Sequence, residues 1–227
     1  PAAPELVRKI HEVFGALPGN GWGMTETMAT VTGHSSEDYL NRPDSCGPPV
    51  GVADLKIVGD DGETELPVGE VGELWARGPM VVKGYWNRPE ATAETFVDGW
   101  VRTGDLAKLD EEGWCYIVDR AKDMIIRGGE NIYPREMERV LEKHPAVRDC
   151  TAFGIPDEKW GERPLVLIVA RDGSLDSTTV RNTFSQAAND GVISRWAVPE
   201  RIEIVDVIPK TSVGKIDKKL LRQQYFA

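Results

Sequence analysis

The clearest pattern at the start of the chain is helical. Apolar residues recur at intervals of three and four from Leu6 to Phe14, which places them on one face of an α-helix. Pro4 stands before this run and Gly15 follows it, and these residue types favour a helix start and a helix end respectively. The pattern therefore predicts a helix that begins near Pro4 and ends at Phe14.

Short apolar runs replace the helical pattern between about residues 50 and 127. Turn sequences rich in Gly and acidic residues, such as 59–62 and 110–113, separate these runs. Such spacing is typical of strands joined by tight turns. We expect a small, mostly β unit with strands over residues 54–58, 73–76, 114–118 and 124–126.

Helical and strand patterns alternate after residue 120. The predicted elements are a helix over 134–143, strands over 147–154 and 165–170, a helix over 178–188, a strand over 202–207 and a helix over 218–225. The run 165–170 is apolar enough for a central strand, and the order is typical of an α+β sandwich. We therefore predict an α+β fold with a boundary near Arg120–Asp123 and two domains, residues 1–121 and 122–227.

Composition excludes several classes of protein. The 27 Lys and Arg residues against 37 Asp and Glu residues give a net charge of −10. A nucleic-acid or anionic-membrane surface usually requires clustered Lys and Arg, so neither partner is expected. No run of about 18 apolar residues is present, and no transmembrane segment is expected. Cys46, Cys115 and Cys150 are too few and too widely spaced for a zinc or disulfide framework, which favours a reducing cytoplasm.

Familiar catalytic motifs are incomplete in this chain. Residues 212–216 resemble the end of a phosphate-binding P-loop, but Pro209 and Ile216 stand where that motif requires Gly and Ser or Thr. A dinucleotide fingerprint that starts at Gly19 would require Gly in place of Met24. The three histidines are isolated in the sequence, so no Ser/His or Cys/His pair is indicated.

The Gly-rich segment 21–26 carries residue types suited to a nucleotide. Glycines let the backbone approach a ligand closely, and Trp22 offers a flat face for a purine. Thr25 supplies a hydroxyl for a phosphate, and Glu26 an oxygen for Mg²⁺. The same residues would also suit a Gly-rich turn beside a core Trp, and residue types alone leave both interpretations open.

Asp105 follows a glycine in the segment 100–105. An acidic side chain after a Gly turn can accept two hydrogen bonds from a ribose diol, as in dinucleotide sites. Taken alone, a turn or helix-capping Asp is the more common interpretation.

Two further segments suit movement and charge stabilisation. Dense charge over residues 118–123 and the run 127–131 would suit either a solvated linker or a moving joint. Lys215 is expected at the tip of a small-residue loop that starts at Pro209. There it could bind phosphate or carboxylate oxygens, or serve only as a solubilising surface charge.

Seven motifs occur in one order along the chain. They span residues 22–26, 72–74, 82–85, 102–105, 119–123, 128–134 and 209–216. This succession resembles the adenylate-forming superfamily, and within it most closely the fatty acyl-CoA synthetases. The resemblance covers essentially the whole chain. It implies a C-terminal half only, because Ala2-Ala3-Pro4 resembles the end of a segment well inside these enzymes. Residues 1–121 would then be a mostly-β remnant of the large AMP-binding domain, and residues 122–227 a small mobile lid domain.

The resemblance also implies an acid–thiol ligase with two half-reactions. A fatty acid, or another carboxylic acid, would react with ATP and Mg²⁺ to give acyl-AMP, and coenzyme A would then accept the acyl group. The phosphate anhydride activates the acyl group, so the three cysteines would be bystanders. A half-length piece would lack the upstream phosphate loop, so we expect it to be inactive alone and able to associate through its uncovered surface.

Residue roles in the nucleotide site follow from the same resemblance. Trp22 would lie beside adenine in place of the usual tyrosine, Thr25 would contact the α-phosphate, and Glu26 would help to hold Mg²⁺. Asp105 would bind the ribose hydroxyls, with Arg120 close to the ribose and phosphate. The implied nucleotide-binding set is Gly21, Trp22, Gly23, Met24, Thr25, Asp105, Arg120 and Lys215.

The resemblance implies that the second domain rotates between the half-reactions. Lys215 would bridge the acyl carboxylate and the phosphate in the first half-reaction, in which Thr25 and Glu26 would also be catalytic. Lys122 stands at the expected hinge, and Gly128 and Gly129 would line the pantetheine tunnel for coenzyme A. An aryl-CoA ligase, a luciferase-like enzyme and a carrier-loading adenylation enzyme remain alternatives, as does a module that binds nucleotide or CoA without turnover.

Overall fold

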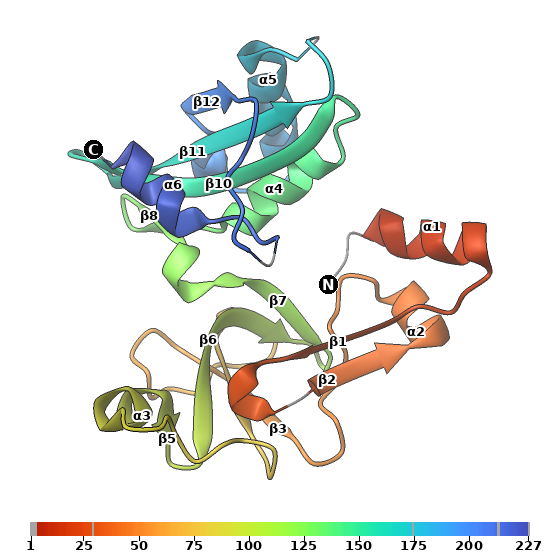
Figure 1. Ribbon diagram of the computed structural model, residues 1–227, viewed down its shortest axis with the longest axis vertical. Helices are drawn as coiled ribbons and strands as arrows, with labels where there is room; N and C mark the ends of the chain where they lie inside the picture. The colour runs from red at the N-terminus through yellow and green to blue at the C-terminus, as the bar shows by residue number, and fades with distance from the viewer. Residues whose placement is uncertain (1–3, 29, 174, 213, 227) are drawn as a thin grey trace. The chain divides into compact units, whose positions relative to one another are not determined.

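The computed structural model describes residues 4–28, 30–173, 175–212 and 214–226, and it divides into two compact units, Pro1–Ala121 and Lys122–Ala227 (Figure 1). Ala2, Ala3 and Val213, which belong to two of the sequence motifs, lie outside the described residues. Both units combine helices with β-sheet, so the predicted α+β fold class is confirmed.

Unit 1 is built mainly from strands. A two-stranded ribbon, β1–β2, accompanies a five-stranded sheet in which β3, β4, β6 and β5 are neighbours and β7 also pairs with β6. The elements are α1 Pro4–Phe14, β1 Gly19–Gly23, the 3₁₀ turn η1 Thr25–Thr27, β2 Thr30–Ser35, α2 Ser36–Asn41, β3 Asp54–Val58, β4 Gly72–Arg77, α3 Pro89–Thr95, β5 Phe96–Val97, β6 Trp100–Leu109 and β7 Cys115–Arg120.

Trp22 joins the ribbon of unit 1 to its larger sheet. Its partly buried ring packs against two clusters of buried residues, one around Leu74 and Cys115 and the other around Ala76 and Val101. A large aromatic side chain buries much apolar surface when it is covered in this way. The packing fixes the position of Trp22, and with it the Gly-rich segment that the sequence marked as a nucleotide site.

Two strands in unit 1 differ from the sequence expectations. The stretch Gly19–Gly23 forms β1 although Gly disfavours strands; a Cβ at Gly21 would lie 2.8 Å from the Thr32 carbonyl oxygen of β2. The expected Gly turn before Asp105 is wrong, since β6 continues from Trp100 to Leu109. Gly104 has a positive φ of 68° inside this strand, so the glycine permits a local irregularity without ending the pairing.

Unit 2 contains one five-stranded sheet with helices on both faces. In the sheet β10, β11, β8 and β9 are neighbours, and β12 also pairs with β11, in parallel. β11 is central, as its apolar sequence predicts. The 3₁₀ turn η2 Ala121–Asp123 begins at the last residue of unit 1. The other elements are β8 Ile125–Arg127, β9 Glu130–Ile132, α4 Pro134–Glu142, β10 Val147–Asp157, β11 Gly161–Ala170, α5 Ser177–Asn189, η3 Arg195–Ala197, β12 Arg201–Ile204 and α6 Lys218–Tyr225.

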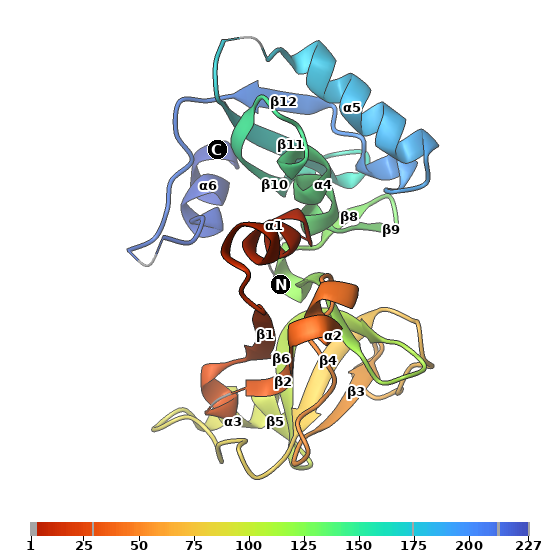
Figure 2. The ribbon, with the colours of Figure 1, turned by 90° about the vertical axis from the view of Figure 1, so that its right-hand side faces the viewer.

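Alternating residues of β11 supply two separate cores in unit 2. Val166 and Ile168 pack with α4 and α5, whereas Leu165 and Leu167 pack on the other face with Leu221 of α6. Successive side chains of a strand point to opposite faces, which explains why the run is apolar throughout. Figure 2 shows α5 and α6 on opposite sides of this sheet.

Candidate functional site

Three of the predicted site residues meet at one point in unit 1. The indole Nε1 of Trp22 donates to Asp105 Oδ2 at 2.7 Å, and Arg120 Nε lies 2.5 Å from Asp105 Oδ1. The two oxygens of one carboxylate are thus held by donors from β1 and β7. An aromatic face, a carboxylate and a guanidinium therefore lie together.

Strand register explains this meeting. Asp105 of β6 and Arg120 of β7 are direct cross-strand partners, so their side chains share a face of the sheet. The Asp105 side chain is nearly buried, at 7% exposure, while the Arg120 side chain is 53% exposed. A buried carboxylate requires such partners because desolvation of an unpaired charge is costly.

The backbone before Asp105 is held by a residue whose role we did not predict. Glu73 of β4 accepts a hydrogen bond from the Gly104 N–H at 3.1 Å and pairs with Arg102 at 3.0 Å. Thr103 Oγ1 donates to the Leu74 carbonyl oxygen at 2.6 Å. The motif over residues 72–74 marked this segment, but only the strand pairing shows what Glu73 contacts.

Thr25 and Glu26 lie on η1, directly after the Trp22 strand. Thr27, fully buried, closes the turn by exchanging hydrogen bonds with the backbone of Met24 at 2.9 and 3.1 Å. Tyr85 donates its hydroxyl to Glu26 Oε1 at 2.6 Å. This bond, with burial as the smaller cause, raises the pKa of Tyr85, so the phenol remains a neutral donor to the Glu26 carboxylate.

Lys215 of unit 2 lies on a closed hairpin. Thr211 N–H donates to the Lys215 carbonyl oxygen at 2.7 Å, and Asp217 N–H donates to the Pro209 carbonyl oxygen at 2.9 Å. Lys210 and Ile216 form a β-bridge at the base. Lys215 is exposed and lies beside this base, so the expectation that it stands at the loop tip is wrong.

Two ion pairs fasten the ends of this hairpin. Lys210 Nζ lies 2.7 Å from Asp149 Oδ2 of β10, and Lys218 Nζ lies 3.4 Å from Glu138 Oε1 of α4. Asp217 then caps α6 by accepting a hydrogen bond from the Leu220 N–H at 3.0 Å. Both flanks of Lys215 are therefore attached to the sheet and helices of unit 2.

Lys122, the predicted hinge residue, lies on η2 at the start of unit 2 and is exposed. Its carbonyl oxygen accepts a hydrogen bond from Arg222 of α6 at 3.1 Å, and Arg222 also pairs with Asp123 at 2.9 Å. The backbone of η2 is therefore fastened to unit 2.

Gly128 and Gly129 form the two-residue turn between β8 and β9. Both have positive φ, 61° and 91°, as a tight hairpin turn of this length requires. A Cβ on Gly128 would lie 2.8 Å from the Trp160 ring, whereas one on Gly129 would meet nothing within 4 Å. Trp160 contacts the ring of Trp196 edge to face at 5.7 Å, and Lys159 Nζ lies 4.6 Å from its ring centroid. An aromatic cluster with a cation thus adjoins the turn.

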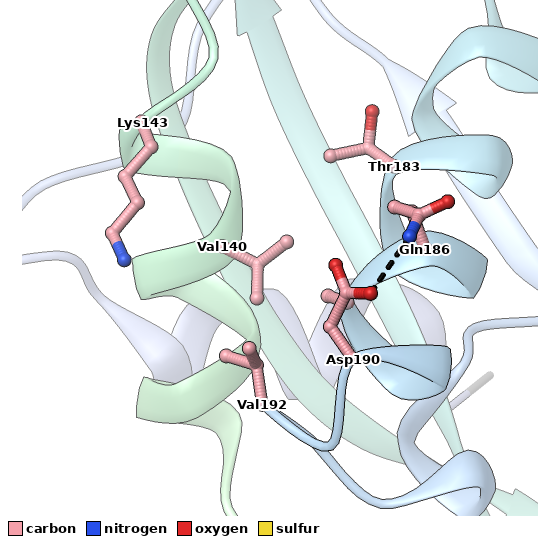
Figure 3. Close-up of a pocket in the computed structure, with 7 residues that line it drawn as sticks. Val140, Lys143, Thr183, Gln186, Asp190 and Val192 are labelled. Atoms are coloured by element: carbon pink, nitrogen blue, oxygen red, sulfur yellow. Dashed lines mark hydrogen bonds between the residues drawn. The ribbon is translucent and has the colours of Figure 1, made fainter.

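Unit 2 also contains a groove (Figure 3). It has a volume of about 410 Å³ and runs between α4 and α5. None of the predicted site residues lines it. The lining residues are Val140, Lys143, Thr183, Gln186, Ala187, Asp190 and Val192.

The cysteines and the side chains that could bind a metal ion were also considered as site residues. Cys46, Cys115 and Cys150 are buried free thiols, and burial raises the pKa of Cys150 to about 12, which makes it a poor nucleophile. Within the described residues, no three His, Cys, Asp or Glu side chains group as metal ligands. Mg²⁺ bound chiefly by substrate phosphates requires only one or two carboxylates, which Glu26 fits. In the same part of the chain, no helix is long and apolar enough to cross a bilayer.

Two family models match most of the chain. The AMP-binding enzyme model matches residues 1–86, and the model of the AMP-binding enzyme C-terminal domain matches residues 136–215. The chain belongs to the AMP-binding enzyme family. The Trp22 segment and Lys215 each fall inside one of the two matched regions.

Curated relatives of the chain include acyl-CoA ligases. A medium/long-chain-fatty-acid–CoA ligase, FadD8 of Mycobacterium tuberculosis, is 38% identical over 98% of this chain and 39% of its own length. A feruloyl-CoA synthase of Amycolatopsis is 40% identical over 90% of this chain and 41% of its own. The chain thus spans about two-fifths of the length of the relatives it matches.

Solved structures of the family share the fold of the chain. ATP-bound MatB of Rhodopseudomonas palustris superposes with a TM-score of 0.89 and 32% identity, over 99% of this chain and 44% of MatB. The o-succinylbenzoate CoA synthetase of Bacillus subtilis, in complex with its acyl-adenylate intermediate, gives 0.87 and 34%, over 99% and 44%. Solved relatives therefore bind ATP and an acyl-adenylate.

Proposed function

We propose that this AMP-binding enzyme chain is part of an ATP-dependent fatty acyl-CoA synthetase. The observation that carries the proposal is the contact of Trp22 and Arg120 with the two oxygens of Asp105. The three side chains offer a face for adenine, acceptors for two ribose hydroxyls and a cation for the phosphate. Together they suit one adenosine monophosphate unit.

In the first half-reaction, an oxygen of the fatty acid carboxylate attacks the α-phosphorus of ATP. A new P–O bond forms, the bond to the bridging oxygen breaks, and pyrophosphate leaves with acyl-AMP as the product. Negative charge accumulates at the phosphorus oxygens, and an aimed cation such as Lys215 stabilises it. Thr25 would donate to the α-phosphate, and Glu26 would share a Mg²⁺ ion with the phosphates of ATP.

In the second half-reaction, the sulfur of coenzyme A attacks the acyl carbon. The C–S bond forms, the bond to the AMP oxygen breaks, and the thiol proton passes to solvent. Unit 2 would rotate at Lys122, withdrawing Lys215 and presenting Gly128 and Gly129 to the pantetheine arm. The cation beside the Trp160 ring, next to that turn, would suit the nucleotide end of coenzyme A.

A fatty acid is the proposed acyl substrate because fatty-acid ligases are among the relatives of this chain. The feruloyl-CoA synthase supports an aryl acid as the second candidate. Buried, free thiols favour a reducing compartment, and we place the protein in the cytoplasm on that basis. We also predict that the half-length chain associates with itself through the exposed apolar side chains of unit 1, and light scattering would measure the mass of the assembly.

The test is carboxylate-dependent ATP–pyrophosphate exchange by the full-length protein, followed by thioester formation. A panel of fatty acids of several chain lengths, with ferulate and succinate, identifies the acyl class. Lys215→Ala should lower exchange by at least about 10²-fold, the scale of one lost charge-stabilising donor, yet retain thioester formation from supplied acyl-AMP. Lys122→Pro should show the reverse split, because Pro restricts φ at the joint.

Several outcomes would contradict the proposal. If no acid on the panel stimulates ATP–pyrophosphate exchange, the protein is better described as a module that binds nucleotide or CoA without turnover. Equal loss of both half-reactions in Lys215→Ala would refute the role of this lysine. If aryl acids are preferred over all fatty acids, the substrate class changes to aryl acids, while the proposed two-step reaction stands.

A further inference from the structure

The hydrogen bond from Trp22 to Asp105 couples two parts of the site that are 83 residues apart in sequence. Its length of 2.7 Å is typical of a bond to a charged acceptor. The Trp22 ring cannot shift freely, because it packs against both buried clusters of unit 1. The indole N–H is thus a fixed donor aimed at Asp105.

A fixed donor on one oxygen and a guanidinium on the other restrict the Asp105 carboxylate. Arg120 holds Oδ1 and Trp22 holds Oδ2, so the plane of the carboxylate is defined from both sides. A carboxylate offers about four acceptor positions, so these donors do not by themselves exclude ligand hydroxyls. Rotating the carboxylate would break one of two charge-assisted bonds.

We propose that the Trp22 indole N–H positions Asp105 for the two hydroxyls of a ribose. Trp22 then has two roles, an aromatic face for the base and a donor that orients the sugar acceptor. The proposal rests on the proposed nucleotide site, and it makes Trp22 a positioning residue for the sugar. Holding an acceptor in place before the ligand arrives removes an ordering cost from binding.

The experiment compares AMP with 2′,3′-dideoxy-AMP by calorimetry on the full-length protein. Both nucleotides carry the same base and phosphate, so their affinity ratio reports the ribose contacts alone. Trp22→Phe keeps an aromatic face but removes the N–H. We expect this variant to lower the ratio of AMP affinity to dideoxy-AMP affinity about tenfold, the scale of a hydrogen bond to a charged group. The smaller ring weakens the base contact of both nucleotides alike, so that loss cancels in the ratio.

Two further variants make the result specific. Trp100→Phe makes the same substitution at a ring that lies over Lys56 and Arg77, and it should leave the affinity ratio of the two nucleotides unchanged. In an Asp105→Ala background the Trp22→Phe change should have no further effect on that ratio, since the group that it orients is gone. Retained dideoxy-AMP binding shows that Trp22→Phe is folded.

Other outcomes separate this inference from the proposed function. If Trp22→Phe leaves the affinity ratio of the two nucleotides unchanged, the positioning role is wrong. When both nucleotides bind more weakly by the same factor, Trp22 acts only through its ring. A wild-type protein that binds AMP no better than the dideoxy nucleotide overturns the ribose site itself, and the proposed function with it.

Discussion

Replacement of Glu138 should distinguish the hydrogen bonds of a buried carboxylate from its charge. Glu138 Oε1 accepts from Thr151 Oγ1 at 3.0 Å and from the Ala152 N–H at 3.1 Å. The same oxygen faces Lys218, while Oε2 lies 3.3 Å from Arg135. One side chain of α4 thereby joins β10 and α6, the helix that follows the Lys215 hairpin.

The expected cost follows from what each substitution leaves behind. Glu138→Ala leaves two donors unsatisfied at Thr151 and Ala152, which are at most 1% exposed, at about 1–3 kcal/mol each. Loss of the partly buried contact with Lys218 adds to this, so we expect a total of about 3 kcal/mol or more. Glu138→Gln retains an acceptor for both donors and loses only the charge, so it should cost about 1 kcal/mol.

Hydrogen exchange measured by mass spectrometry over β10 provides the assay, with urea titration giving the free energy of unfolding. Glu138→Ala should accelerate exchange in β10, and the Gln variant should resemble wild type there. A cost below about 1 kcal/mol for Glu138→Ala, or equal costs for both variants, would show that Glu138 does not satisfy these two donors in the folded protein, because buried unsatisfied donors are expensive.

Three further predictions concern local features. Gly128→Ala should lower the melting temperature more than Gly129→Ala, because both residues have positive φ but only the first Cβ would press on Trp160; equal shifts would contradict this. The three buried thiols should resist Ellman's reagent until the protein unfolds, and rapid native labelling would be the contrary result. The phenolate absorbance of Tyr85, measured as the difference between wild type and Tyr85→Phe, should appear with a midpoint above pH 10, because the hydrogen bond from its hydroxyl to Glu26 raises the pKa of Tyr85. That bond stabilises the fold below pH 10 and is lost as pH rises through the raised pKa; a midpoint at or below pH 10 would argue against it.

The helices α1, α4, α5 and α6 were predictable from sequence because their signals are local, whereas α2 and α3 were not predicted. α1 begins at Pro4 and ends before Gly15, and α6 spans Lys218–Tyr225 with Asp217 as its cap. Apolar spacing and capping residues lie within a few positions of each other, so no distant contact is required to find them. The same holds for strand β3.

Strands β1 and β6 were not predictable because distant partners decide them. The backbone of Gly21 lies so close to β2 that a Cβ would be 2.8 Å from the Thr32 carbonyl oxygen, so the glycine is required by a strand that is distant in sequence. The charged residues of β6 find partners on β4 and β7, as Arg102 does with Glu73 and Asp105 with Arg120. The pattern of apolar and polar residues indicates which face of a strand is buried, but it does not indicate which strand is its neighbour. Neither of these two ion pairs could therefore be predicted from it.

The candidate site shows the same division. The order of the motifs singled out Trp22, Asp105 and Arg120, but not the indole bond that joins the first two. That bond depends on the packing of β1 against the larger sheet, which is a long-range property. The sequence assigned no role to Glu73, although it lies in one of the motifs, and none to Glu138, because an acidic residue in a helix or strand is usually a solvated surface group.

The most direct test of the proposed nucleotide site is a crystal structure of the full-length protein with AMP at saturating concentration. We expect adenine against the face of Trp22, both ribose hydroxyls on the carboxylate of Asp105, and Arg120 beside the sugar or phosphate. AMP bound elsewhere on the molecule, with these three side chains unoccupied, would contradict it.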